Sequence, residues 1–355
     1  MDTKQPPEHS LARFPEWVAR GVGQVVFQNS WLSGLIILAA ILFNSWIYFS
    51  ICLLGTIVAT AMAVALRADR GLISSGLFGF NGALVGLALV AFTSADFRAG
   101  AVPSVHMLAY IIFAAAMTSV VFSALSSLLQ PYKVAALTAP FVLVGWLFLF
   151  AILKFANIES GPLAKPVSPD DYQATTDYIL PTWYMGIGNG IGQIFFQDNW
   201  ITGYLIVLGI AVNSRIAAGM ALFGAALAAL VAVIFGGPEG AIRDGLFGYN
   251  AALTAIAVGG FFIVLTLPAF LYTVFGIFVS VWLWASVAIF LSPIDMPVLT
   301  STFVLVTWLM LLGAPGFKAL IPVAPPDATT PEGNRKRVLG GSARPTTEVL
   351  EGQRR

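Results

Sequence analysis

The sequence predicts an all-α integral membrane protein with about ten transmembrane helices and two re-entrant half-helices, arranged in two inverted repeats. Three observations support this fold class. Of the 355 residues, 58% are hydrophobic and only 10% are charged, whereas an average soluble protein has about 25% charged residues. Mean hydropathy is +0.86. Long apolar runs alternate with short polar segments, and this pattern occurs twice along the chain.

Ten apolar segments, five in each half, are the candidate spans. Several of them are shorter than the ~20 residues that a straight span requires. Short apolar segments interrupted by glycine at matching places of two halves are typical of transporters with a site near the bilayer centre. The segments are 31–49, 51–66, 83–95, 107–129 and 135–153, then 200–213, 216–235, 250–267, 268–291 and 298–313.

Polar stretches divide the chain into five parts. We expect a cytoplasmic N-terminal segment (1–20), a first repeat (21–155), an extracellular or periplasmic linker (156–182), a second repeat (183–315) and a cytoplasmic basic tail (316–355). The tail is rich in proline, glycine and charge, which predicts disorder, and its basic run favours the cytoplasmic side. We expect a multi-pass protein of the plasma membrane, which in a bacterium is the inner membrane, and an even number of spans then places both termini in the cytoplasm.

Three motifs of the first half return in the second half at nearly constant spacing. Because each half has about five spans, an odd number, the second half enters the membrane from the opposite side. This predicts an inverted repeat about a pseudo-two-fold axis in the membrane plane. The motifs are GLFGFNGAL at 76–84 and GLFGYNAAL at 245–253, QVVFQNSW at 24–31 and QIFFQDNW at 193–200, and LTAPFVLV at 137–144 and LTSTFVLV at 299–306.

The polar residues that both halves retain are uncharged. A charge at the bilayer centre would mark an ion or proton pathway, so the lack of a mid-span charge argues against a proton- or sodium-coupled pump. Amides and hydroxyls suit a small neutral solute that forms hydrogen bonds. The retained pairs are Gln24/Gln193, Gln28/Gln197, Asn81/Asn250 and Thr138/Thr300.

Some of these features have a structural interpretation beside the functional one. The motif glycines favour close helix packing, and the Asn81/Asn250 pair fits an interhelical hydrogen bond as well as solute contact. Asn44 and Asn213 favour buried interhelical hydrogen bonds, and Asp198 favours an N-terminal helix cap.

Paired aromatic residues accompany the paired amides. Two facing rings form a flat slot that can hold a planar molecule by stacking. The pairs are Phe27/Phe196, Phe78/Phe247 and Phe80/Tyr249. The single cysteine, Cys52, excludes an intrachain disulfide, and neither histidine is expected to be a ligand, so we expect no metal or other cofactor.

Taken together, the motifs resemble the urea transporter family over about residues 15–313. The resemblance rests on GFNGALVG at 79–86 and GYNAAL at 248–253, on the two Gln-x-x-Phe-Gln segments and on the two Leu-Thr-x-x-Phe segments. The second copy departs from the first at Ala251 and Ala255. Gln193 stands where family members often carry an acidic residue.

The resemblance implies a bacterial homotrimer in the lipid bilayer, with one pore inside each protomer and passive, channel-like conduction of urea. It implies slot walls from aromatic and leucine side chains, hydroxyls from Thr138 and Thr300 at the constriction, and acceptors for urea N–H groups from Gln24 and Gln193 with nearby carbonyls. The implied pore positions are Gln24, Val25, Phe27, Phe80, Leu84, Thr138, Gln193, Ile194, Phe196, Tyr249, Leu253 and Thr300.

Other functions explain the sequence less well. The closest alternative is a channel for another small neutral solute, such as ammonia, water or a short amide. An ammonia channel of the known type would carry pore histidines, and only His106 is an intramembrane candidate; an aquaporin would carry Asn-Pro-Ala pairs, which the sequence lacks. A membrane enzyme would need convergent catalytic groups, and a scaffold does not explain the paired polar residues. The net charge of +1 indicates no nucleic-acid partner.

Overall fold

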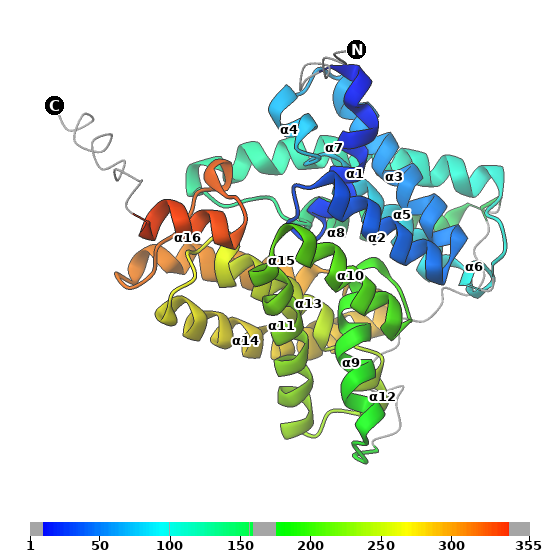
Figure 1. Cartoon of the computed structure of the whole chain (residues 1–355). Coiled ribbons are helices and arrows are strands. Elements are labelled where there is room, and N and C mark those ends of the chain that lie inside the picture. Colours follow the sequence, from blue (N-terminus) through cyan, green and yellow to red (C-terminus); the bar gives the residue numbers. More distant parts are fainter. Residues whose placement is uncertain (1–9, 99, 156, 159–174, 341–355) are drawn as a thin grey trace, which may run out of the picture.

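The computed structural model describes residues 10–98, 100–155, 157–158 and 175–340, which form a bundle of helices (Figure 1). No strand is formed in these described ranges, and one isolated antiparallel bridge joins Ile263 to Pro322. The predicted all-α membrane fold is confirmed. In the part of the chain that the structure describes, four helices are long and apolar enough to cross a bilayer alone: α3 (Trp46–Ala65), α7 (Val105–Leu129), α11 (Arg215–Ile234) and α14 (Leu267–Leu291).

The other apolar helices are shorter, so the number of about ten spans and the two half-helices stay predictions. α5 (Gly79–Thr93) has 15 residues and is therefore only ~22 Å long, against ~30 Å for the hydrocarbon core. α9 (Leu180–Gly192) with its 3₁₀ extension η5 (Gln193–Phe195) meets α10 (Trp200–Asn213) at a bend of 70°, and this bent pair is long and apolar enough to form one more span.

The remaining elements are short helices and connecting turns. In the first half they are η1 (Leu11–Arg13), α1 (Phe14–Gln24), α2 (Trp31–Asn44), α4 (Arg70–Ser74), α6 (Ala95–Arg98), η2 (Gln130–Tyr132), α8 (Ala139–Ala151) and η3 (Ile152–Lys154). In the second half they are α12 (Glu239–Arg243), α13 (Gly248–Ile256), the π-helical turn η6 (Ala257–Phe261), η7 (Ser292–Ile294), α15 (Ser301–Gly313), η8 (Ala314–Gly316), η9 (Pro325–Asp327) and α16 (Pro331–Leu339).

The sequence repeat is also a structural repeat. α2, α3, α4 and α5 precede α10, α11, α12 and α13 by one constant offset along the chain, and α7 and α8 precede α14 and α15 by a slightly shorter one. The offset changes where the first half forms α6 and the second half forms η6. Left-handed backbone positions repeat as well: Gly76 and Gly245 both have φ of 77°, and Leu137 and Leu299 have φ of 53° and 52°.

Polar side chains begin corresponding helices in both halves. Ser45 and Ser214 accept hydrogen bonds at the starts of α3 and α11. Ser30 caps α2, and Asn199 caps α10 by accepting from the Thr202 nitrogen at 3.1 Å. The prediction that Asp198 is this cap is therefore wrong, because the residue that corresponds to Ser30 in the repeat is Asn199 and not Asp198.

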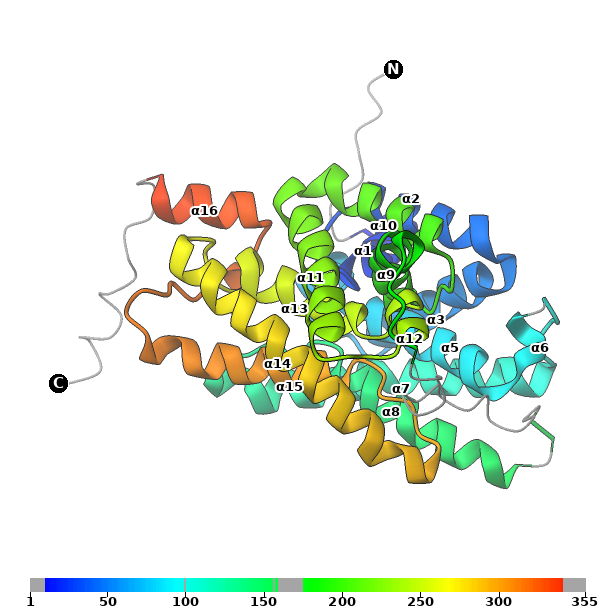
Figure 2. The same ribbon diagram turned by 90° about the horizontal axis from the view of Figure 1, so that it is seen from below.

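The two halves contact each other reciprocally. Asn44 Nδ2 donates to Gln197 Oε1 at 3.0 Å, and the equivalent Asn213 Nδ2 donates to Gln28 Oε1 at 2.9 Å. These are hydrogen bonds between the halves, although Asn44 itself is exposed rather than buried. α2 and α10 lie side by side (Figures 1 and 2). Reciprocal contacts of this kind define a pseudo-two-fold axis, whereas its direction in a membrane stays a prediction.

Tryptophan side chains extend the reciprocal pattern. Trp146 Nε1 donates to the Pro297 carbonyl at 2.8 Å, and the equivalent Trp308 Nε1 donates to the Ala135 carbonyl at 2.9 Å. Each indole therefore ties α8 or α15 of one half to the loop before the same helix in the other half. The loop-and-helix units that carry Thr138 and Thr300 are thereby held face to face.

The chain after α15 is ordered over the described residues 316–340, where the sequence predicted disorder. Residues 321–323 pair with residues 262–264: the Val264 nitrogen donates to the Ile321 carbonyl at 2.9 Å, and the Val323 nitrogen donates to the Phe262 carbonyl at 2.8 Å. Apolar side chains such as Leu320 are buried by this pairing. Residues 341–355 of the predicted tail and most of the predicted linker lie outside the described residues.

α16 is fixed by two polar side chains at an edge of the molecule (Figure 2). Asn334 is fully buried, and its Nδ2 donates to the carbonyls of Gly260 at 3.0 Å and Phe261 at 2.8 Å, where the helix that follows α13 is broken. The Glu332 carboxylate accepts from the Ser214 hydroxyl at 2.6 Å and from the Ile216 nitrogen, in the first turn of α11, at 2.8 Å. Charge-rich composition therefore did not prevent packing, because its polar groups find specific partners.

The substitution Asn334→Ala tests this docking. It leaves two buried carbonyls without their amide donor, which costs about 1–3 kcal/mol. We expect a lower thermal unfolding midpoint in detergent and faster proteolysis within residues 316–340. Arg335→Ala, on the exposed side of the same helix, is the matched control and should match the unsubstituted chain. Equal midpoints for the two variants would contradict a stabilising role for Asn334.

Candidate functional site

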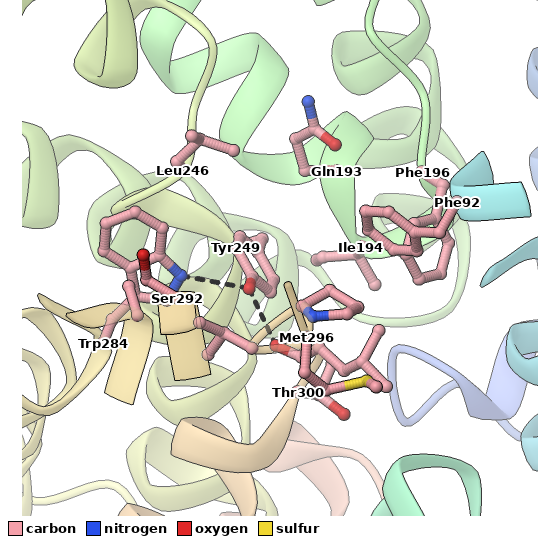
Figure 3. Close-up of a pocket in the computed structure, with 14 residues that line it drawn as sticks. Phe92, Gln193, Ile194, Phe196, Leu246, Tyr249, Trp284, Ser292, Met296 and Thr300 are labelled. Atoms are coloured by element: carbon pink, nitrogen blue, oxygen red, sulfur yellow. Dashed lines mark hydrogen bonds between the residues drawn. The ribbon is translucent and has the colours of Figure 1, made fainter. Parts of the chain in front are cut away.

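A pocket opens between the two halves, next to the pair of residues that meets on the pseudo-two-fold axis (Figure 3). Its cavity is small, with a volume of about 90 Å³. None of the described residues that line it is charged. The lining consists of Phe92 from the first half and, from the second half, Gln193, Ile194, Phe196, Leu246, Tyr249, Trp284, Ala288, Ser292, Met296, Pro297, Val298, Leu299 and Thr300.

Five of the twelve predicted pore residues meet in this pocket: Gln193, Ile194, Phe196, Tyr249 and Thr300. Thr138 joins them through the hydrogen bond to Thr300. The first-half residues Gln24, Val25, Phe27 and Phe80 occupy equivalent places in the other copy and do not line this pocket. Leu84 and Leu253 are fully buried in α5 and α13 and do not line it either.

Thr138 and Thr300 form the centre of the site. Their Oγ1 atoms lie 2.6 Å apart, and both side chains are buried. Each threonine is the residue before a helix, a position where a threonine side chain usually caps the helix. Neither makes such a cap. Both hydroxyls are therefore free to meet each other across the axis.

Two buried asparagines replace the threonines as helix caps. Asn81 Oδ1 accepts from the Phe141 nitrogen and Asn250 Oδ1 accepts from the Phe303 nitrogen, both at 3.1 Å. Their Nδ2 atoms donate to the carbonyls of the left-handed Leu137 and Leu299, at 3.4 and 3.2 Å. Because both ends of each amide are engaged, the structure favours the structural interpretation of this pair over direct solute contact.

Gln24 and Gln193 present their oxygen atoms as the free group. Gln24 Nε2 donates to the Ser75 carbonyl at 2.8 Å, and Gln193 Nε2 donates to the Asp244 carbonyl at 3.2 Å. Neither Oε1 atom has a protein hydrogen-bond partner among the described residues. Because each donor end is fixed, each glutamine can offer an acceptor to a solute that carries N–H groups.

Two left-handed residues, Phe27 and Phe196, place aromatic rings between the halves. Their φ angles are 63° and 58°, which few residues other than glycine adopt. The Phe27 ring lies 4.8 Å from that of Phe261 and 6.0 Å from that of Phe303. Reciprocally, the Phe196 ring lies 5.8 Å from Phe92 and 6.1 Å from Phe141. Each ring thus packs on the opposite half.

The two halves differ in the aromatic residues beside the pocket. In the first half, Phe122 packs against Phe78 and Phe80 at 5.1 and 6.0 Å. In the second half, Trp284 replaces Phe122 and packs against Phe247 at 4.7 Å. Tyr249, which replaces Phe80, lies beside Trp284 in the pocket (Figure 3) and accepts a hydrogen bond from it at 3.1 Å.

Sequence reasoning missed several residues of the site. Phe92 and Phe261 occupy equivalent positions of the two copies, as do Phe141 and Phe303, so the repeat alone could have indicated them. Phe141 and Phe303 even lie inside the motifs at 137–144 and 299–306. Trp284 gave no such signal, because its counterpart Phe122 is a different residue in a helix without a repeated motif.

Glycines at the motif allow the main chains to approach closely. A Cβ atom at Gly82 would overlap the carbonyl oxygen of Gly55 in α3, which supports the predicted packing role. Gly245 has φ of 77°, and a Cβ atom there would overlap the backbone nitrogen of Gly190 in α9. Gly245 directly follows Asp244, whose carbonyl holds Gln193, so this close approach places the glutamine.

Comparison with known proteins identifies similar chains. The family model described as "Urea transporter" matches residues 15–315. Urea transporter 1 of Rattus norvegicus is 31% identical over 305 residues, which are 85% of this chain and 77% of the relative. Urea transporter 1 of Mus musculus shows the same identity and coverage. Urea transporter 1 of Ovis aries is 30% identical over 302 residues, 84% of this chain and 77% of the relative.

Gly245→Ala should disrupt the loop that holds Gln193. The added methyl group meets backbone atoms that cannot rotate away, and the left-handed conformation disfavours alanine. We expect a lower yield of monodisperse protein and a lower unfolding midpoint. Gly219→Ala is the control, because a Cβ atom at Gly219 meets open space. Equal behaviour of the two variants would show that the loop tolerates a side chain.

Proposed function

The chain belongs to the urea transporter family, and from this premise we propose that it conducts urea passively through a path that passes Gln193, Tyr249 and the Thr138–Thr300 pair. One observation carries the proposal: among the described residues, none that lines the pocket is charged, and the side-chain hydrogen bonds between the halves use only amides, hydroxyls, indoles and backbone carbonyls. Such a site belongs to a transporter rather than an enzyme, and it suits a neutral solute that crosses by facilitated diffusion.

The hydrogen-bonding groups of the site fit urea. Urea is flat and has four N–H donors and one carbonyl acceptor. The free Oε1 atoms of Gln24 and Gln193 and the hydroxyls of Thr138 and Thr300 can replace water as partners, each for about 0.5–1.5 kcal/mol net. Binding of this strength remains weak enough for the solute to leave.

We further propose the setting in which conduction takes place. The four long apolar helices and the many exposed large apolar side chains, such as Phe290 and Val105, support a multi-pass protein surrounded by lipid. The plasma membrane, cytoplasmic termini, the inverted orientation of the halves and a homotrimer with one path in each protomer follow from the sequence and from its resemblance to the family.

Urea flux through the purified chain in proteoliposomes tests the function directly. We expect stopped-flow light scattering to show fast urea entry without a proton or sodium gradient, because no described lining residue is charged. Ammonia, water and formamide serve as comparison solutes. Urea flux that requires an ion gradient, or that is slower than flux of the comparison solutes relative to protein-free vesicles, would contradict the proposal.

Thr300→Val tests the centre of the path. Valine keeps the shape of threonine and removes the hydroxyl, so the Thr138 hydroxyl loses its partner at 2.6 Å. We expect urea flux to fall about tenfold, at ~1.4 kcal/mol for one hydrogen bond in the path, with unchanged size-exclusion behaviour. Thr302→Val is the matched control, since this buried threonine lies two residues further along the chain, in α15, and its hydroxyl has no hydrogen-bond partner among the residues that the structure describes. Unchanged flux in Thr300→Val would remove this hydroxyl from the mechanism.

A further inference from the structure

A hydrogen-bonded chain of three groups exists in the second half only. Trp284 Nε1 donates to Tyr249 Oη at 3.1 Å, and Tyr249 Oη donates to the Leu299 carbonyl at 2.7 Å (Figure 3). In the first half, Phe122 and Phe80 stand at the positions of Trp284 and Tyr249, and neither side chain can form a hydrogen bond. The second half therefore carries two hydrogen-bonding side chains, Trp284 and Tyr249, at positions where the first half has phenylalanines, and both line the pocket.

The Tyr249 hydroxyl fills one of the acceptor positions of the Leu299 carbonyl oxygen. This oxygen accepts from Tyr249 and also from Asn250 Nδ2 at 3.2 Å. A carbonyl oxygen has two lone pairs, so its acceptor capacity is filled by the protein. The equivalent Leu137 carbonyl accepts a side-chain bond only from Asn81, at 3.4 Å, among the described residues. The Leu299 carbonyl, from a residue that lines the pocket, thus has no acceptor position left for a solute.

The Tyr249 hydroxyl offers an acceptor in place of the filled Leu299 carbonyl. Its single proton is directed at the Leu299 carbonyl, so toward the pocket the oxygen can only accept. The indole N–H of Trp284 occupies one side of the hydroxyl and fixes its rotation. Gln193 is oriented in the same sense, because its Nε2 is bound and its Oε1 is free. The Tyr249 hydroxyl and the Gln193 amide oxygen, two of the polar groups that line the pocket, can therefore both accept from a solute.

We propose that Trp284 is a positioning residue for solute selection: through Tyr249 it holds an acceptor toward the path and so favours solutes with several N–H donors. The inference rests on the proposed urea conduction and names the group that shapes its selectivity. Packing does not explain the indole, because the ring contact of Trp284 with Phe247 is matched by that of Phe122 with Phe78. The polar groups that are new in the second half are the indole N–H of Trp284 and the hydroxyl of Tyr249, and they are hydrogen-bonded to each other.

The test is a double-substitution cycle in proteoliposomes with Trp284→Phe, Tyr249→Phe and the double variant. Trp284→Phe should lower urea flux about two- to tenfold, the range that one net hydrogen bond gives, and should lower formamide flux less, since formamide has half as many N–H donors. If Trp284 acts through the Tyr249 hydroxyl, the double variant should match Tyr249→Phe alone. Trp282→Phe is the matched control, because Trp282 lies on the same helix, half exposed and outside the pocket.

The outcomes separate this inference from the function on which it rests. A wild-type chain that carries no urea would overturn the proposed function. A wild-type chain that carries urea, with effects of the two substitutions that multiply, would overturn only the assignment of Trp284. An equal loss of urea and formamide flux in Trp284→Phe would overturn it too, because a purely structural defect narrows the path for both solutes alike.

Discussion

The centre of the molecule depends on two asparagines that cap helices belonging to a distant segment. Asn81 and Asn250 satisfy the first turns of α8 and α15 and hold the left-handed residues Leu137 and Leu299. A left-handed leucine costs about 1–2 kcal/mol, which the amide bonds offset. Because the caps come from elsewhere, the threonines that follow these leucines keep their hydroxyls for each other.

The duplicated arrangement of helices could be predicted from the sequence because the repeated motifs mark equivalent positions in the two halves. The spacing between motifs at 24–31 and 193–200 is the spacing between α2 and α10. Gln193 and Thr300 were predicted for the same reason, and both line the pocket, while their role in conduction stays a prediction. The orientation of the glutamines depends on their contacts with the carbonyls of Ser75 and Asp244, which the sequence does not reveal.

Features without a repeated counterpart could not be predicted. The tail appeared disordered because its composition is polar, yet Asn334 and Glu332 find partners at the broken helix after α13 and at the start of α11. Trp284 was missed because its importance lies in a difference from Phe122. Leu84 and Leu253, which the family resemblance implied at the pore, are buried in α5 and α13 and do not line this pocket, so their place at the path stays a prediction. Composition and motifs do not report contacts between distant segments.

The two halves share the residues at their contact but differ at Trp284 and Tyr249, and this difference allows a nearly symmetric site to be selective. The symmetric part, made of the threonine pair and the two glutamines, offers hydroxyls and amide oxygens but no charge. An ion that entered would lose hydration worth far more than a few hydrogen bonds of about 1 kcal/mol each could replace. A neutral solute loses only hydrogen bonds, and these the path can replace. Discrimination among neutral solutes must then come from where acceptors and donors stand, and that is where Trp284 and Tyr249 depart from the symmetry.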